Sequence, residues 1–347
     1  MDNQIYYLFV LTIASYVLAF VFYSFRIALE RESLYKYARG LTYLGLAAAL
    51  TALSIRWHDA GHPPLSNMYE SMITLSTFIA LAGMFFTFKR PIAILEAGTC
   101  VAAIITLGIA SVYVAEARPL IPALQSYWLH VHVSLAFIGE ACFAIAFLLS
   151  YLFCFRQYVT GDYSGTPSTS EKAASTGVVF LLPLLFLGLM GAIARHLSTH
   201  PMYIESWRNI IWGTMVSTCV AVIALIIFTL YDKASVGARA QKWLPEPALL
   251  DTLTYRAIAV GYPLFTVGAM IFGMVWANQA WGRYWGWDPK ETWSLITFLT
   301  YSLYLHIRLM RGWKGTWTAV VSVIGFLVTA FTLFGVNYLI SSLHSYS

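Results

Sequence analysis

The sequence predicts an all-α, polytopic integral membrane protein with about ten transmembrane helices and with the N-terminus and the C-terminus outside. Two observations predict this fold class. Hydrophobic residues make up 59% of the chain and charged residues only 11%, whereas soluble domains are about 45–50% apolar and about 25% charged. The apolar residues also form long runs, and an α-helix satisfies all the backbone hydrogen bonds of such a run within itself.

Ten apolar runs follow one another along the chain, each close to the roughly 20 residues that cross a bilayer core. They are Ile5 to Phe25, Gly40 to Ile55, Tyr69 to Phe88, Ile92 to Val112, His132 to Phe155, Thr176 to His196, Ile210 to Tyr231, Ile258 to Trp276, Trp293 to Ile307 and Trp317 to Tyr338. No basic leader precedes the first run, so we expect a permanent helix there rather than a cleaved signal.

The basic residues predict the orientation. With the N-terminus outside, 15 of the 21 lysines and arginines fall on the inner side and six on the outer side, as the positive-inside rule requires. These residues are scattered between apolar runs instead of clustered, so the net charge of +5 indicates no nucleic-acid partner. The four cysteines form no Cys-x-x-Cys pair, which argues against a thiol–disulfide exchanger.

Two polar linkers divide the chain into three parts. Gln157 to Ser175 and Ala234 to Arg256 are the least apolar stretches and are read as inner connections. We therefore expect an N-terminal group of helices in residues 1–156, an inserted helical hairpin with its linkers in 157–256, and a C-terminal part in 257–347.

The tryptophan-rich segment, residues 276–293, is the main chemical signal. It holds five of the 12 tryptophans, interleaved with Gly282, Gly286 and charged side chains. An ordinary interfacial belt of aromatic rings would account for it. A flat apolar surface edged by cations would also suit a planar aromatic ligand that carries carboxylates. Composition alone leaves both interpretations open.

Histidines and one glutamate within or beside the spans give the second signal, because ionisable residues in a membrane are costly. His132 and His344 lie at outer helix ends, whereas His306 lies about 20 Å along a helix from Trp293, in the inner half of the core. A hydrogen-bonded interfacial histidine is the ordinary explanation for each of them. Glu140, inside the fifth span, could belong to a proton path or be a neutral, hydrogen-bonded carboxyl.

The residues from Trp281 to Trp293, Trp-Gly-Arg-Tyr-Trp-Gly-Trp-Asp-Pro-Lys-Glu-Thr-Trp, resemble the WWD signature of haem-handling proteins. The likeness is to the CcsA/ResC family of cytochrome c biogenesis (system II) in particular. It extends to Leu-His-Ile-Arg at His306 and Leu-His-Ser-Tyr at His344. Upstream it includes Pro-Pro-Leu-Ser-Asn-Met-Tyr-Glu-Ser from Pro63 and the stretch Leu-Gln-Ser-Tyr-Trp-Leu-His-Val-His-Val that ends at Val133, so it covers most of the chain.

The resemblance implies haem b as cargo, with His132 and His344 as axial iron ligands outside and His306 as an iron ligand within the membrane. A ResB-like membrane partner would supply the second axial ligand of the haem iron that His306 binds. We expect Arg283 and Lys290 to contact the haem propionates. The remaining residues expected at the outer site are Trp281, Tyr284, Trp285, Trp287, Asp288 and Trp293.

The implied activity is delivery of haem and its attachment to an apocytochrome c through thioether bonds, as a subunit of a holocytochrome c synthase. Residues 257–347 would form the WWD core, on the periplasmic face of the bacterial cytoplasmic membrane. A haem transporter or assembly scaffold that makes no bonds is an alternative, as is a bis-histidine electron-transfer membrane protein. Family members often have eight spans, so the hairpin from Thr176 to Tyr231, with His196 and His200, is an insertion whose role the resemblance does not supply.

Overall fold

The computed structural model describes residues 3–111, 113, 124–163, 166–199, 223, 227 and 229–339. These residues form helices and connecting turns, with no strand in the described ranges, and the predicted all-α class is confirmed. Seven of the described helices are long and apolar enough to cross a membrane, so the chain is a polytopic membrane protein. Most of the predicted span from Ile210 to Tyr231 lies outside the described residues, and the total of ten spans and the orientation stay predictions.

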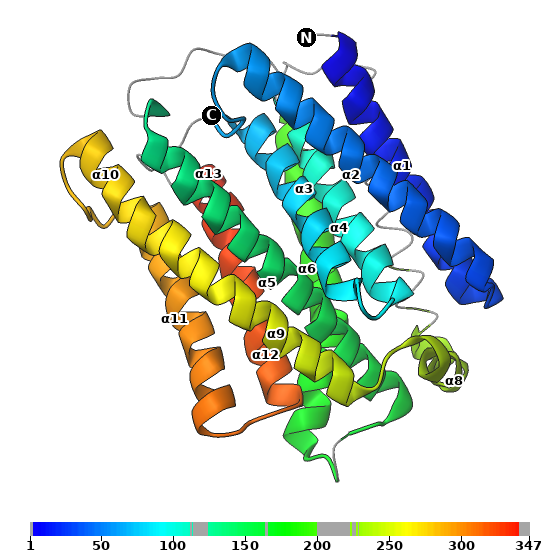
Figure 1. Cartoon of the computed structure of the whole chain (residues 1–347). Helices are drawn as coiled ribbons and strands as arrows, with labels where there is room; N and C mark the ends of the chain where they lie inside the picture. Colours follow the sequence, from blue (N-terminus) through cyan, green and yellow to red (C-terminus); the bar gives the residue numbers. More distant parts are fainter. Residues whose placement is uncertain are drawn as a thin grey trace. The chain divides into compact units, whose positions relative to one another are not determined.

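Figure 1 labels the α-helices in chain order. They are α1 (Asn3–Leu29), α2 (Glu32–Ala60), α3 (Met68–Thr87), α4 (Ala93–Ala110), α5 (Tyr127–Thr160), α6 (Thr169–Thr199), α8 (Lys233–Trp243), α9 (Pro247–Phe265), α10 (Gly273–Trp281), α11 (Pro289–Met310), α12 (Thr316–Ala330) and α13 (Val336–Leu339), with the π-helical segments η2 (Thr266–Phe272) and η3 (Phe331–Gly335).

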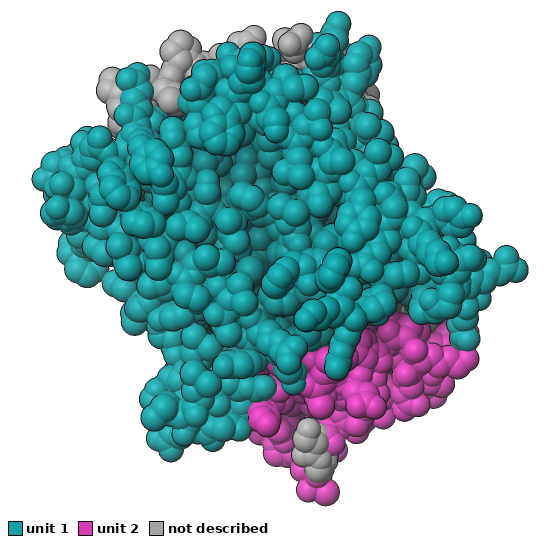
Figure 2. Space-filling view, viewed as in Figure 1, with its two compact units in different colours: residues 1–149, 252–313, 321–347 teal, residues 150–251, 314–320 magenta. Residues whose placement is uncertain are grey.

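The chain divides into two compact units, which Figure 2 colours separately. The first comprises residues 1–149, 252–313 and 321–347, and the second comprises residues 150–251 and 314–320. The candidate site described below lies entirely within the first unit. The three-part division expected from the sequence stays a prediction.

In the first unit, α1 packs against α2 and α4, and α3 packs against α4. The start of α3 is fixed by a buried ion pair, in which Arg56 Nε donates to Glu70 Oε1 at 2.6 Å. The other Glu70 oxygen accepts from the backbone and the hydroxyl of Ser66, while Asn67 caps the helix by accepting from the Glu70 N–H. The Ser-Asn-Met-Tyr-Glu motif therefore anchors the loop that leads into α3.

The other half of the first unit is organised by close packing of α5 against α9 and η2. A Cβ on Gly268 would lie 2.6 Å from the Ala136 nitrogen, and one on Gly139 would lie 2.8 Å from the Phe265 nitrogen. Only glycine allows the backbones to approach this closely, as small residues do at helix interfaces in membranes. Pro263 within α9 has no N–H to donate, and the helix continues beyond it as the π-helical η2.

In the second unit, one arginine orders the connection before α9. Arg156 Nη1 donates to the carbonyls of Leu244 and Pro245, and its Nη2 donates to Asp162 at 3.2 Å. Asp251 accepts from the Gly315 N–H at 3.1 Å. The bonds of Arg156 satisfy two backbone carbonyls of the polar stretch that the sequence marks as a linker.

Candidate functional site

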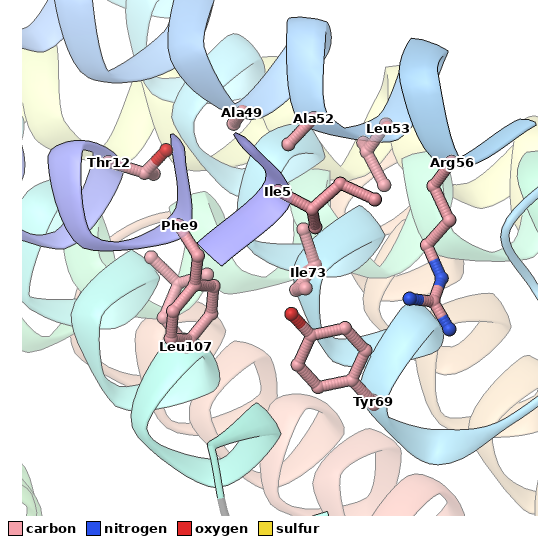
Figure 3. A pocket seen from close by; sticks show the side chains of 10 residues that line it. All are labelled: Ile5, Phe9, Thr12, Ala49, Ala52, Leu53, Arg56, Tyr69, Ile73 and Leu107. Carbon is pink, nitrogen blue, oxygen red and sulfur yellow. The ribbon is translucent and has the colours of Figure 1, made fainter. Parts of the chain in front are cut away.

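Two cavities in the first unit differ in what they can hold. The first lies among α1, α2, α3 and α4, where Figure 3 shows Arg56 reaching toward Tyr69 beside apolar side chains. Its volume is about 10 Å³, which is no more than the space of one water molecule. The second, here called the His132 cavity, has a volume of about 150 Å³. A cavity of this size can hold a benzene-sized group, so it is the candidate ligand site.

The side chain of His132 forms part of the wall of this cavity and is held by a bond to the π-helical segment. Its Nδ1 lies 2.9 Å from the Gly268 carbonyl oxygen. Because a carbonyl oxygen can only accept, Nδ1 carries the hydrogen in this bond. The lone pair of the neutral ring is then on Nε2, the arrangement in which a histidine acts as a metal ligand.

A buried tryptophan fixes the plane of the same imidazole. The Trp276 ring is 1% exposed and stacks on His132, with a centroid distance of 5.8 Å and an interplanar angle of 11°. Trp281 packs edge-on against Trp276 at 4.8 Å. Trp276 thus connects the tryptophan-rich segment to the expected iron ligand.

The rest of the tryptophan-rich segment turns between α10 and α11. Gly282 ends α10 in the left-handed region (φ +73°), and Trp287 also has a positive φ of 57°, which is uncommon for a residue with a side chain. Tyr284 and Trp285 line the cavity. Trp287 is 69% exposed, and its ring is perpendicular to that of Trp285 at 5.7 Å.

Asp288, Pro289 and Glu291 form the start of α11. The Asp288 carboxylate accepts from the Lys290 N–H, and Glu291 accepts from the N–H groups of Asp288 and Gly286 at 3.2 and 2.7 Å, which completes a capping box. Pro289 occupies the first turn, where a missing N–H costs nothing. The Asp-Pro-Lys-Glu part of the motif therefore has a structural role: it begins the helix beside the cavity.

Charged groups reach the cavity from two helices. Lys290 at the start of α11 donates to Asn337 Oδ1 at 3.2 Å, and Glu140 of α5 lines the same cavity. Burial lowers the pKa of Lys290, against the opposing effect of the Glu140 and Asp288 carboxylates. Arg283 instead folds over Gly286, where an added Cβ would lie 2.6 Å from its Nε.

The other expected site residues lie apart from the cavity or outside the described residues. The Trp293 ring packs against Phe331 of η3 at 4.2 Å. His306 is an exposed residue of α11. His344 and His200 lie outside the described residues, as does the side chain of His196.

Sequence reasoning missed several residues that shape the cavity. Leu65, Met68 and Ser71 line it and come from the loop and first turn that the Glu70 ion pair anchors. Gly268 supplies the carbonyl that accepts from His132, and the only sequence signal for its irregular helix was Pro263 five residues earlier. Asn337, which also lines the cavity, was not among the residues expected at the site.

Comparison with known proteins identifies the family. The family model described as cytochrome C assembly protein matches residues 65–344. Proteins described as cytochrome c biogenesis protein CcsA are similar over most of the chain. The one from Synechococcus sp. (strain JA-3-3Ab) is 36% identical over 87% of this chain and 82% of its own length. The one from Porphyra purpurea is 34% identical over 91% and 88%, and that from Gloeobacter violaceus is 32% identical over 90% and 87%.

The family match spans the tryptophan-rich segment, α5 with His132, and the loop that leads into α3. The similarity to the relatives covers more than four fifths of each chain. The chain therefore belongs to the cytochrome c assembly protein family and is a membrane protein of cytochrome c biogenesis.

Proposed function

We propose that the His132 cavity holds one edge of a haem b molecule and presents it for attachment to an apocytochrome c. The observation that carries the proposal is the state of His132. Its ring is fixed by the Gly268 carbonyl on one side and by the Trp276 face on another, in the wall of a cavity lined by aromatic rings. An outer bond of this kind orients a metal-ligating histidine and raises its basicity.

The second axial ligand in this proposal is His344. Two imidazoles would leave the iron no open coordination position, which limits its reaction with oxygen while haem is carried. Departure of haem then requires that another ligand displace one of them. The histidine of the apocytochrome Cys-x-x-Cys-His motif has the chemistry for this exchange.

The size of the cavity supports binding of an edge rather than of the whole ring. A volume of about 150 Å³ accommodates a group as large as benzene, which corresponds to one pyrrole with its substituent. In this proposal the ammonium group of Lys290, which donates to Asn337, pairs with one propionate. The rest of the porphyrin would extend beyond the cavity, toward the partner proteins.

His306 fits a separate role in haem entry. It lies on the exposed side of α11, one helical turn from the exposed Leu303 and Met310, so its imidazole is directed at the surroundings of the first unit. A ligand from a ResB-like membrane partner would complete an iron site there. Haem would pass from this membrane site to the His132 cavity, on the periplasmic face of a bacterial cytoplasmic membrane.

The attachment itself is an addition without net oxidation. Each cysteine S–H of the apocytochrome adds across one vinyl C=C bond, with the sulfur bonding to one carbon and the proton going to the other. The contribution of this chain is to fix the porphyrin edge relative to the incoming thiols, because proximity and orientation alone lower such barriers substantially.

Co-expression with the partner and an apocytochrome c tests the proposal. We expect covalent haem on the acceptor, detected by its peroxidase activity in a denaturing gel, and loss of this signal in His132→Ala. The matched control is His58→Ala, since the His58 side chain is 91% exposed. Continued haem export without attachment in the unsubstituted chain would favour the transporter or scaffold, and full attachment in His132→Ala would contradict the proposal.

A further inference from the structure

The wall of the His132 cavity includes a carboxyl group, that of Glu140, which has no role in the function proposed above. Glu140 lies eight residues after His132 on α5, or about 12 Å further along the helix. Its Oε2 atom is buried and has no hydrogen-bond partner among the described residues, although the side chain borders the cavity. An unpaired buried carboxylate is strongly disfavoured in a membrane protein, so its charge must be balanced or its proton retained.

The balancing group is Lys290, which lines the same cavity and interacts electrostatically with Glu140. Lys290 does not donate to the buried Oε2 atom of Glu140, and a polar group that enters the cavity has both side chains in its wall. The other titratable groups facing the cavity are His132, Tyr284 and Glu291, and the buried Tyr301 of α11 also interacts electrostatically with Glu140. Glu291 is committed to two backbone N–H groups, and Asp288, beside Lys290, caps α11.

Transfer of a proton between Lys290 and Glu140 does not change the total number of protons on the two side chains. A carboxylate with an ammonium and a carboxylic acid with an amine hold the same number of protons, and both are neutral overall. A ligand carboxylate entering this space adds one negative charge. The pair and the ligand carboxylate together stay neutral only if the pair gains one proton and becomes a carboxylic acid with an ammonium.

We propose that Glu140 and Lys290 act together as a carboxylate receptor that takes up one proton from solution when a ligand carboxylate enters the cavity. This inference rests on the proposed function, in which that carboxylate is a haem propionate. Deprotonation of the pair then weakens the hold on the propionate, so release of haem is coupled to release of a proton.

Binding of haem and of haem dimethyl ester to the purified chain provides the test, because the ester presents the same iron and ring without free carboxylates. The ratio of the two affinities cancels the titration of the iron ligands. Between pH 7 and 9 the propionates are already ionised. Uptake of one proton makes this ratio fall by up to about tenfold per pH unit, and ester binding shows that each variant is folded.

Two variants decide the outcome. In Glu140→Gln the ligand carboxylate no longer meets the Glu140 carboxylate, and Lys290 keeps Asp288 beside it, so we expect the ratio to stay constant to pH 9. In Lys290→Met we expect the preference for the free acid to disappear. A pH-independent ratio in the unsubstituted chain, an equally steep fall in Glu140→Gln, or a retained preference in Lys290→Met would overturn the inference. Failure of both haem and its ester to bind would instead contradict the proposed function.

Discussion

Replacement of Gly268 by alanine tests whether the close approach of η2 to α5 orients His132. A Cβ at this position would lie 2.6 Å from both the Ala136 nitrogen and the Leu135 Cβ, whereas ordinary contacts of a Cβ are 3.4 Å or longer. The π-helical segment must therefore retreat from α5 by about 0.8 Å. A retreat of this size would stretch the 2.9 Å bond from His132 to the Gly268 carbonyl beyond hydrogen-bonding range.

The stability of Gly268→Ala depends on one favourable and two unfavourable free-energy terms. Alanine gains about 1 kcal/mol of helix propensity over glycine. Overpacking costs about 1–3 kcal/mol, and the lost hydrogen bond costs about 0.5–1.5 kcal/mol more. We expect Gly268→Ala to be less stable by roughly 0.5–3.5 kcal/mol and to bind haem about 10–100-fold more weakly, as when the outer partner of a metal ligand is lost.

The assay is a haem titration followed by visible absorption, with thermal unfolding in detergent measured on the same samples. Gly108→Ala is the matched control, because a Cβ there would have nothing within 4 Å. Equal haem affinity in the two variants would refute the claim that the approach of η2 to α5 orients His132.

Two further predictions concern structural groups. Arg56→Met leaves the fully buried Glu70 carboxylate without its cation, so we expect a loss of about 3–5 kcal/mol, measured as a lower midpoint of thermal unfolding; Arg26→Met, which removes an ion pair to the exposed Glu32, should cost less than about 1 kcal/mol, and equal losses would argue against the anchoring role. Asp288→Asn preserves a good N-cap and should keep haem binding, whereas Asp288→Ala should destabilise the start of α11 by about 1 kcal/mol; a loss of binding in Asp288→Asn as large as in Asp288→Ala would indicate that the carboxylate contacts the ligand.

The sequence was sufficient for the class of fold because bilayer physics leaves few choices. Long apolar runs must be helical, and residues 293–307, predicted as a span, lie within a helix that extends from Pro289 to Met310. The capping box at Asp288 explains why this helix begins before the apolar run. Local rules of this kind act over a few residues and can be read directly from the chain.

The geometry of the cavity could not be read in this way, because it depends on pairs of residues far apart in the sequence. His132 and Gly268 are 136 residues apart, and no periodicity reports that a π-helical turn offers its carbonyl to that ring. From the sequence, the tryptophan-rich segment could also be interpreted as a single flat apolar surface. The structure distributes its rings: Trp276 stacks on His132, Trp285 lines the cavity, and Trp293 packs on Phe331.

Glu140 is a residue whose importance the sequence predicted but whose interaction partner it did not. Its position within a predicted span marked it as a costly residue that needs an explanation. The explanation depends on Lys290, which α11 brings to the same cavity from 150 positions further along the chain. Only the packing of the two helices joins them.

The most direct test of the central claim is the visible absorption spectrum of the haem-loaded chain, compared with those of His132→Ala and His344→Ala. We predict a six-coordinate, low-spin spectrum for the unsubstituted chain. Each variant should lose it and recover it when free imidazole is added to replace the missing ring. An unchanged low-spin spectrum in His132→Ala would contradict the assignment of this cavity as the haem site.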